Sequence, residues 1–254
     1  MKTRKYIYWL LALLCYLPAF TQSPVKIQRL KAGEKTCLHE GWFARKASEI
    51  GEDGNRLTEQ PFEATGWMKA KVPGTVLTTL LENKIYPAPE FGLNNQLIPD
   101  IFHVGRAFYT YWFACPFTME ALLPGQHAWL NFRGINYKAE IYLNGKRVNT
   151  VTHEGMFLRQ SYDITSYLKE DGTNVLAVLV FPPDHVGNPN GGQGGDGQIA
   201  RNCTMQYTPG WDWIQPVRDR NTGIWDEVSI AVTKDVRVQH PYVVTKVPGV
   251  RIPS

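Results

Sequence analysis

The sequence predicts an all-β fold, a two-sheet sandwich or jelly roll with one short helix. Three observations support this class. Short segments with alternating or wholly apolar residues follow one another closely, turn residues are abundant (22 Gly and 17 Pro in 254 residues), and no regular alternation of strands and helices is present. At 43% hydrophobic and 20% charged residues, the chain is also too apolar to be disordered.

Several segments have strand patterns. Residues 127–133 and 227–232 alternate between apolar and polar side chains, and residues 106–117 are rich in Phe, Tyr and Trp. Residues 174–181 are apolar on both faces, which predicts a central strand between two layers. Residues 236–244 begin a further extended segment.

A β-hairpin is predicted around Asn144 and Gly145. Ala139, Ile141 and Leu143 share one face of a strand over 138–143, and Asn-Gly follows at once. Both of these residues tolerate the positive φ that a two-residue hairpin turn needs. The return strand is expected over 146–151.

One helix is predicted after the turn formed by Pro73 and Gly74. Thr75 is placed to cap its N-terminus, and the leucines at 77, 80 and 81 form a stripe along one side. Two stretches, 87–101 and 182–209, have no periodicity, and the second contains a glycine-rich run at 191–197. A loop this long in a compact domain is either functional or disordered.

The first residues have the pattern of a secretory signal. A basic segment at 1–5 precedes an apolar run over 6–20, which is shorter than the roughly twenty residues that span a bilayer. We therefore expect a signal peptide over 1–22, export to the periplasm or the extracellular space, and no stable membrane span. A retained membrane anchor is the alternative.

The charge balance excludes one class of partner. Without the cations Lys2, Arg4 and Lys5, 24 Lys and Arg stand against 23 Asp and Glu. A strongly basic face for nucleic acid is therefore not expected.

Cysteine and histidine spacing predicts no metal site and no cofactor. Cys37, Cys115 and Cys203 form no CxxC motif, and at least one of them must be unpaired, so buried small apolar residues are the favoured interpretation. The His-Glu pairs at 39–40 and 153–154 lack the second His of a zinc-protease motif.

The polar-aromatic cluster Trp211, Asp212 and Trp213 is the strongest candidate site. Aromatic faces pack against the C–H side of a pyranose, and a carboxylate accepts hydrogen bonds from its hydroxyls, so this cluster predicts a sugar contact at a loop end. The alternative is that both Trp are core residues and Asp212 caps a turn. The run 218–221 (Arg-Asp-Arg-Asn) is either a surface ion-pair loop or the lattice that positions this cluster.

The order of several motifs resembles the N-terminal sugar-binding domain of glycoside hydrolase family 2. The motifs run in order along the chain: Trp67 with Val-Pro-Gly-Thr-Val at 72–76, Tyr-Trp-Phe at 111–113, Phe-Arg-Gly-Ile at 132–135, Ala-Glu-Ile-Tyr-Leu-Asn-Gly at 139–145, and Gly-Ile-Trp at 223–225. The resemblance covers roughly 36–235 and implies a galactose-binding-domain-like jelly-roll β-sandwich. Within the family, 210–213 and 218–225 are most similar to the β-mannosidase, endo-β-mannosidase and exo-β-glucosaminidase branch.

The resemblance also implies roles for individual residues. Trp211 would help wall the pocket for a terminal sugar and Asp212 would hydrogen-bond its hydroxyls, while Trp213 and Arg218 would support the loop. The substrate class implied is a β-linked oligosaccharide or glycoside. The family's retaining mechanism uses two glutamates on a (β/α)8 barrel, one of which follows an Asn. The chain has no Asn-Glu dipeptide, so no catalytic residue is expected here and the chain alone should be inactive.

The expected organisation is a signal peptide at 1–22, the sugar-binding sandwich at 23–235, and at 236–254 the start of a linker to an immunoglobulin-like domain, with the barrel beyond it. The leading hypothesis is an accessory domain of an exported, retaining β-mannosidase-like hydrolase. The alternatives are a free-standing carbohydrate-binding module without catalysis and a structural domain that only packs against its neighbours.

Overall fold

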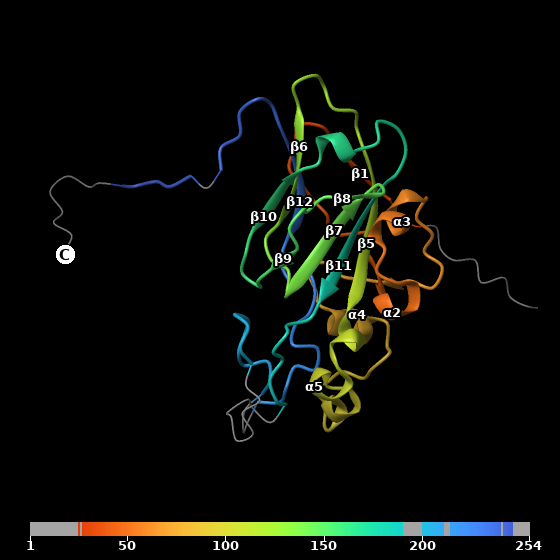
Figure 1. Cartoon of the computed structure of the whole chain (residues 1–254), viewed down its shortest axis with the longest axis vertical. Helices are drawn as coiled ribbons and strands as arrows, with labels where there is room; N and C mark the ends of the chain where they lie inside the picture. The colour runs from red at the N-terminus through yellow and green to blue at the C-terminus, as the bar shows by residue number, and fades with distance from the viewer. Residues whose placement is uncertain (1–24, 26, 190–199, 211–213, 240, 246–254) are drawn as a thin grey trace, which may run out of the picture.

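The computed structural model describes residues 25, 27–189, 200–210, 214–239 and 241–245. They form a β-sandwich of two sheets, which confirms the predicted fold class (Figure 1). The larger sheet has the order β4-β3-β5-β11-β7-β8, with β1 also paired to β5 and β9 to β7. Its strands are β1 (Gln28–Leu30), β3 (Phe43–Lys46), β4 (Met68–Lys69), β5 (Tyr111–Met119), β7 (Lys138–Leu143), β8 (Lys146–Arg147), β9 (His153–Glu154) and β11 (Asn174–Phe181).

The smaller sheet has four strands in the order β10-β6-β12-β2. They are β2 (Thr36–Cys37), β6 (His127–Phe132), β10 (Gln160–Asp163) and β12 (Val228–Thr233). Of the strand pairs described in the two sheets, β1 with β5 is parallel and the others are antiparallel. Neighbouring strands are mostly distant in sequence, so the chain crosses repeatedly between sheets, as the jelly-roll class requires.

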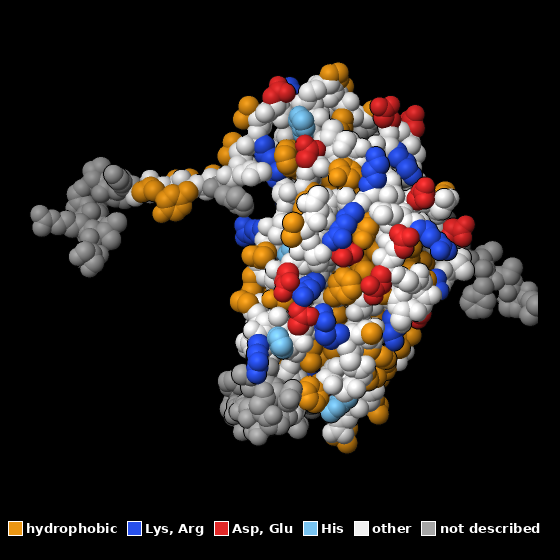
Figure 2. Space-filling model, viewed as in Figure 1, with side chains coloured by type: hydrophobic (Ala, Val, Ile, Leu, Met, Phe, Trp, Pro, Cys, Tyr) orange, Lys and Arg blue, Asp and Glu red, His pale blue; other side chains and the backbone are white. Residues whose placement is uncertain are grey.

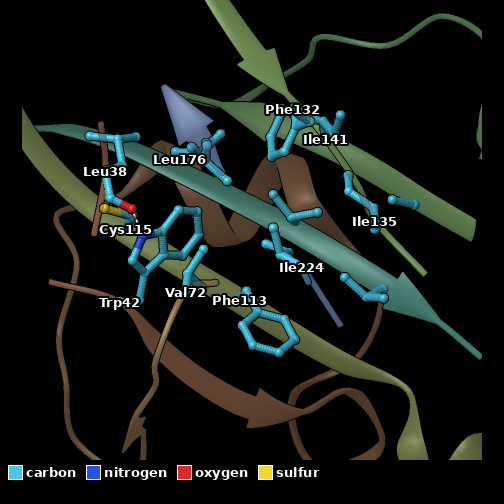
Figure 3. Packing of buried hydrophobic residues seen from close by; sticks show 14 of the residues in the cluster. Leu38, Trp42, Val72, Phe113, Cys115, Phe132, Ile135, Ile141, Leu176 and Ile224 are labelled. Carbon is cyan, nitrogen blue, oxygen red and sulfur yellow. Dashed lines mark hydrogen bonds between the residues drawn. The ribbon is translucent and has the colours of Figure 1, made fainter. Parts of the chain in front are cut away.

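The main hydrophobic core lies between the two sheets (Figure 3). Phe113 and Leu176 of the larger sheet face Phe132 of the smaller one, and all three are essentially inaccessible to solvent. The Trp42 indole fills one side of this core, and its Nε1–H donates to the backbone carbonyl of Leu38 at 2.8 Å. Burying that indole is therefore compatible with its polar atom.

Strand β11 is the central buried strand that its sequence predicts. Leu176, Val178 and Val180 point into the main core, while Ala177 and Leu179 belong to a second cluster on the outer face of the sheet. Two short helices, α2 (Ala47–Ile50) and α3 (Gly54–Glu59), lie with that outer face, and α3 contacts β7, β8 and β11 (Figure 1). A strand covered on both sides explains the absence of alternation.

The predicted hairpin is present, with a shorter return strand than expected. Asn144 and Gly145 have φ values of 51° and 82°, as this turn requires. β8 ends at Arg147 because the side chain of Asn149 then replaces a strand: its Oδ1 accepts from the Ile141 amide and its Nδ2 donates to the Ala139 carbonyl.

The prediction of a strand over 106–117 is wrong in its first part. Residues Arg106–Tyr109 form a 3₁₀ turn, η2, and β5 begins only at Tyr111. The Thr110 hydroxyl donates to the Arg106 carbonyl at 3.1 Å and closes this turn. Aromatic residues are typical of strands, but two of these lie in a turn, in which Tyr109 is fully inaccessible to solvent and Phe108 is half-buried.

Helix α4 (Val76–Glu82) follows the predicted turn, and Thr75 is its N-cap in a reciprocal capping box with Thr78. The expectation of one helix is incomplete. The described chain also contains α2, α3, α5 (Ile101–Val104) and the 3₁₀ turns η1 (Asn94–Leu97), η2 and η3 (Thr165–Tyr167). Each has only three to six residues, which is too short for a helical period to be visible in sequence.

The cysteines and the last residues depart in part from expectation. Cys115 is buried as predicted, but Cys37 is half-buried and Cys203 is exposed, and all three are free thiols. The described residues of the predicted segment 236–244 belong to no strand, and Val236 and Tyr242 are largely exposed. No helix in the described part of the chain is long and apolar enough to span a membrane.

Candidate functional site: a buried arginine lattice at one end of the sandwich

The guanidinium of Arg220 is the centre of a buried network at the end of the sandwich that carries α4 and α5 (Figure 1). Nη1 and Nη2 each donate to one carboxylate oxygen of Asp100, both at 2.9 Å, and both side chains are only 1% exposed. The other donors reach the backbone carbonyls of Val186, Gly187 and Val217. All five N–H groups of the guanidinium therefore have partners.

Three chain segments meet at this guanidinium because each contributes an acceptor. Asp100 is also the N-cap of α5, where its Oδ1 accepts from the Phe102 amide at 2.9 Å. Val186 and Gly187 lie early in the long loop 182–209. Val217 lies just after the segment that carries the Trp-Asp-Trp cluster. A buried ion pair that is fully hydrogen-bonded fixes these loops to one another.

The backbone at Arg220 is held in an uncommon conformation. Arg220 and Asn221 both have positive φ, 52° and 59°, a region that residues other than glycine rarely adopt. The buried amide of Asn136 donates to the carbonyls of both residues, at 2.8 and 2.9 Å. These two hydrogen bonds hold the turn that directs the Arg220 side chain inward.

Arg218, the one predicted site residue inside the described chain, reinforces the same network. Its Nε donates to the carbonyl of Asn95 at 2.9 Å and its Nη1 lies 3.5 Å from Asp100 Oδ2. In return, the Asn95 amide donates to the Pro216 carbonyl at 3.1 Å, and the Ile101 amide donates to the Arg218 carbonyl. Arg218 thus joins the segment 216–218 to η1 and α5. Its guanidinium contacts other parts of the protein and is largely buried.

Asp219 connects the network to helix α4. Its carboxylate is fully buried and accepts hydrogen bonds from the backbone amides of Leu77, at 2.7 Å, and Asn221, at 2.9 Å. Burial raises the pKa of Asp219 to about 6, and the hydrogen bonds from Leu77 and Thr75 oppose the rise. The Leu77 amide is one of the free donors of the first turn of α4, so Asp219 stabilises that end of the helix.

The segment that carries the Trp-Asp-Trp cluster has its two ends fixed. The Val217 amide donates to the Thr208 carbonyl at 2.8 Å, which joins the chain before and after it. Gly210 has φ of 88°, and a Cβ there would lie 2.6 Å from the Ile214 carbonyl oxygen. Only glycine fits this close approach. Trp211, Asp212 and Trp213 themselves lie outside the described residues, so their predicted roles stay predictions.

An exposed apolar segment adjoins the network. The side chains of Phe91, Leu93 and Leu97 are 65–69% exposed, while Asn95 between them is buried against Pro216. Apolar side chains are visible at this end of the molecule in Figure 2. The same end of the sandwich therefore carries both the fixed ends of the Trp-Asp-Trp segment and an exposed apolar surface.

Part of this site is predictable from the sequence and part is not. The run 218–221 allows either a surface ion-pair loop or a lattice, and the structure shows a buried lattice. Asp100 escapes sequence reasoning because it lies in the aperiodic stretch 87–101, with no local motif around it. Among the described residues, no three His, Cys, Asp or Glu side chains are arranged to hold a metal ion.

The sequence matches a known family of domains. The family model described as "Glycosyl hydrolase 2 galactose-binding domain-like" matches residues 43–226. A mannosylglycoprotein endo-β-mannosidase of Lilium longiflorum is 50% identical over 216 residues, which cover 83% of this chain and 22% of that protein. An exo-β-D-glucosaminidase of Streptomyces avermitilis is 28% identical over 218 residues, covering 85% of this chain and 21% of the relative.

Solved structures give the same result for the fold. The β-D-mannosidase of Dictyoglomus thermophilum superposes with a TM-score of 0.54 at 27% identity, over 78% of this chain and 22% of that one. The exo-chitosanase of Amycolatopsis orientalis has a TM-score of 0.62 at 24% identity, over 80% of this chain and 21% of that one. The chain thus spans about a fifth of the length of these much longer glycosidases. It belongs to the galactose-binding-like domain family of glycoside hydrolase family 2.

Proposed function

We propose that residues 23–235 are the N-terminal sugar-binding domain of an exported, retaining β-mannosidase-like glycoside hydrolase. In this proposal, bond cleavage belongs to a (β/α)8 barrel outside these 254 residues, reached through the linker that begins at 236 and an immunoglobulin-like domain. The domain itself supplies Trp211 as an aromatic wall and Asp212 as a hydrogen-bond acceptor for a terminal β-linked sugar.

The observation that carries the proposal is the buried pair of Arg220 and Asp100. A site that selects a sugar by a few hydrogen bonds needs a loop held to within a fraction of an ångström. Arg220 fixes Val217 at one end of the Trp-Asp-Trp segment, and Val217 is bonded back to Thr208 at the other. A rigid base of this kind suits a loop that presents side chains to a ligand.

The exposed apolar side chains of Phe91, Leu93 and Leu97 support contact with further polypeptide at the same end. A cluster of large exposed apolar groups beside a polar loop is typical of an interaction surface. A domain that completes a sugar pocket together with a neighbour would bring both features to the shared boundary.

The decisive experiment measures kcat/KM for an aryl β-mannoside with the longer polypeptide that contains this domain. Asp212→Ala should lower kcat/KM by about 10- to 100-fold, the effect of losing a hydrogen bond to a charged group. Asp171→Ala is the matched control, since Asp171 is exposed and in another part of the sandwich. Unchanged kcat/KM in the Asp212 variant would refute the proposed contact between Asp212 and the substrate.

A second measurement uses the 254-residue chain alone. We expect no release of product from the aryl β-mannoside, because the chain supplies no catalytic carboxylate pair in this proposal. Turnover at enzyme-like rates would refute the proposed division of labour. A different pair of results would be tight binding of β-mannan fragments by the isolated chain together with unchanged kcat/KM in the Asp212→Ala variant of the longer polypeptide. That pair of results would support a carbohydrate-binding module without a part in catalysis.

A further inference from the structure

A hollow of about 690 Å³ lies beside α2 and α3, on the outer side of the larger sheet. It is formed by these two helices and the segment 60–67, which are different elements from those of the arginine lattice. Its volume is within the range of small-ligand sites, about 300–1,000 Å³.

The floor of the hollow is aromatic and aliphatic. Phe62 and Trp67 meet edge to face with ring centroids 5.3 Å apart, and Ile50 and Leu57 complete the surface. All four pack against the second hydrophobic cluster, which holds them in place. Trp67 is half-buried, and its indole N–H donates to no other described residue. An indole fixed on one side and open on the other is a suitable platform for a flat ligand face.

The rim of the hollow carries polar groups that have no partner within the described chain. Gln60, Glu63 and the guanidinium of Arg56 are exposed and make no hydrogen bond or ion pair to another described side chain. Asp53 uses one carboxylate oxygen to cap α3, and Glu49 pairs with Arg45. Donors and acceptors are thus available around an apolar floor.

The charge of the rim restricts the class of ligand. The carboxylates of Glu49, Asp53 and Glu63 line the hollow with Arg56, and Arg45 neutralises Glu49, so Asp53 and Glu63 stand against one lining cation. This excess of negative charge disfavours an anionic ligand and is compatible with a neutral or amine-bearing one.

A second hollow provides a contrast. It measures about 510 Å³ and is lined by Met119, Leu122 and Leu168 with polar neighbours such as Lys169 and Glu170, but it contains no aromatic ring. Of these two hollows, only the first combines a ring face with free hydrogen-bonding groups, the pairing that recognises a pyranose.

We propose that the hollow between α2, α3 and the segment 60–67 binds one pyranose unit of a saccharide without acidic groups. The C–H face of the ring packs on Trp67, and its hydroxyls are hydrogen-bonded by Gln60, Glu63 and Arg56. This site does not depend on the role proposed for Asp212, because it uses none of the same residues.

The test is calorimetric titration of the whole chain with linear trimers of mannose, glucose and glucosamine, and with trigalacturonate as the anionic probe. At least one of the trimers of mannose, glucose and glucosamine should bind. Trigalacturonate should bind at least tenfold more weakly than that trimer. The exposed double variant Gln60→Ala/Glu63→Ala should weaken this binding at least tenfold. Trp67→Leu keeps an apolar side chain in the cluster but removes the ring face, and it should have the same effect.

A control variant tests whether the saccharide binds at this hollow. Glu170→Gln alters the second hollow and should leave binding unchanged. Absence of binding by all three non-acidic trimers, or preference for trigalacturonate, would overturn the proposal. So would binding that survives Gln60→Ala/Glu63→Ala but is lost in Asp212→Ala, since that result would place the saccharide at the Trp-Asp-Trp loop alone.

Discussion

Arg220 and Asp100, 120 positions apart in the chain, form a two-pronged ion pair that is almost completely removed from solvent. The pair joins the N-terminus of α5 to the turn before Asn221. The remaining donors of Arg220 reach the loop that contains Val186 and Gly187, and the Val217 carbonyl at the start of the same turn. A buried charge pair contributes little net stability by comparison with apolar packing, but the loss of one partner leaves the other charge buried alone. Its main effect is therefore to fix the arrangement of the loops.

Arg220→Met should reduce the free energy of unfolding by about 3–5 kcal/mol, because Asp100 would be left without its main cationic partner. Arg220→Lys should also be destabilising, since an ammonium group cannot reproduce five donors in a planar fork. Urea unfolding followed by tryptophan fluorescence measures both. Lys71→Met is the control: the Lys71–Glu82 pair is mostly exposed, so its loss should cost less than about 1 kcal/mol. Equal effects of Arg220→Met and Lys71→Met would contradict the structural role.

Much of the fold follows from local sequence pattern. The alternation in β6 places Ala128, Leu130 and Phe132 in the core, and the capping residue Thr75 correctly marks the start of α4. These predictions succeed because side-chain period and capping are properties of neighbouring residues. Helix α3 could not be predicted in this way. It packs on β7 because Gly54 has no Cβ, which would lie 2.3 Å from the Tyr142 ring, and that contact is between residues distant in sequence.

The candidate site, like the fold, can be predicted from the sequence only in part. The run 218–221 has a composition that suggests a polar network, but its partners are not visible from the run itself. Asp100 and Asn136 come from two other parts of the chain, and only the fold brings their side chains to Arg220. Sequence reasoning could therefore nominate Arg218 as a support but could not identify Arg220 as the central residue.

The stability of the chain should carry a specific pH dependence from Asp219. Its pKa rises from 3.8 to about 6 in the folded state because of burial, so the folded chain binds a proton more readily than the unfolded chain. The contribution of Asp219 to the free energy of unfolding is fully present below pH 3.8 and is lost as pH rises through about 6. Between pH 4 and pH 7 this amounts to about 3 kcal/mol.

Asp219→Asn isolates that contribution, because Asp163, Asp184 and Glu227 have lowered pKa values and give the opposite slope in both proteins. The free energy of unfolding of the parent minus that of the variant should fall as pH rises from about 4 to about 7. Asp171→Asn, at an exposed position, should give a curve parallel to that of the parent. A parallel curve for Asp219→Asn as well would show that the carboxyl titrates normally in the folded chain.

Gly210→Ala should loosen the Trp-Asp-Trp loop at its base. The added Cβ would lie 2.6 Å from the Ile214 carbonyl oxygen and 2.9 Å from the Pro216 nitrogen, in addition to the cost of positive φ. Gly172→Ala carries the same kind of φ, 92°, with nothing within 4 Å of the new Cβ, so the difference between the variants isolates the steric contact. Amide exchange at Val217, which is bonded to Thr208, should accelerate in the Gly210 variant only. Equal rates of Val217 amide exchange in the two variants would show that the close contact at Gly210 does not hold the base of the loop.

The apolar segment offers a test of contact with further polypeptide. Phe91→Ser, Leu93→Ser and Leu97→Ser combined should change the unfolding free energy of the isolated chain by less than about 0.5 kcal/mol per site, because these side chains are already mostly exposed. In the longer polypeptide the same triple variant should lower the temperature at which this domain unfolds, since an interdomain contact would be lost. Val151→Ser, also largely exposed but on another part of the sandwich, is the control and should have no such effect in either context. If the triple variant behaved like Val151→Ser in the longer polypeptide, the segment would face solvent there too, and the proposal that this end of the sandwich meets a neighbouring domain would fail.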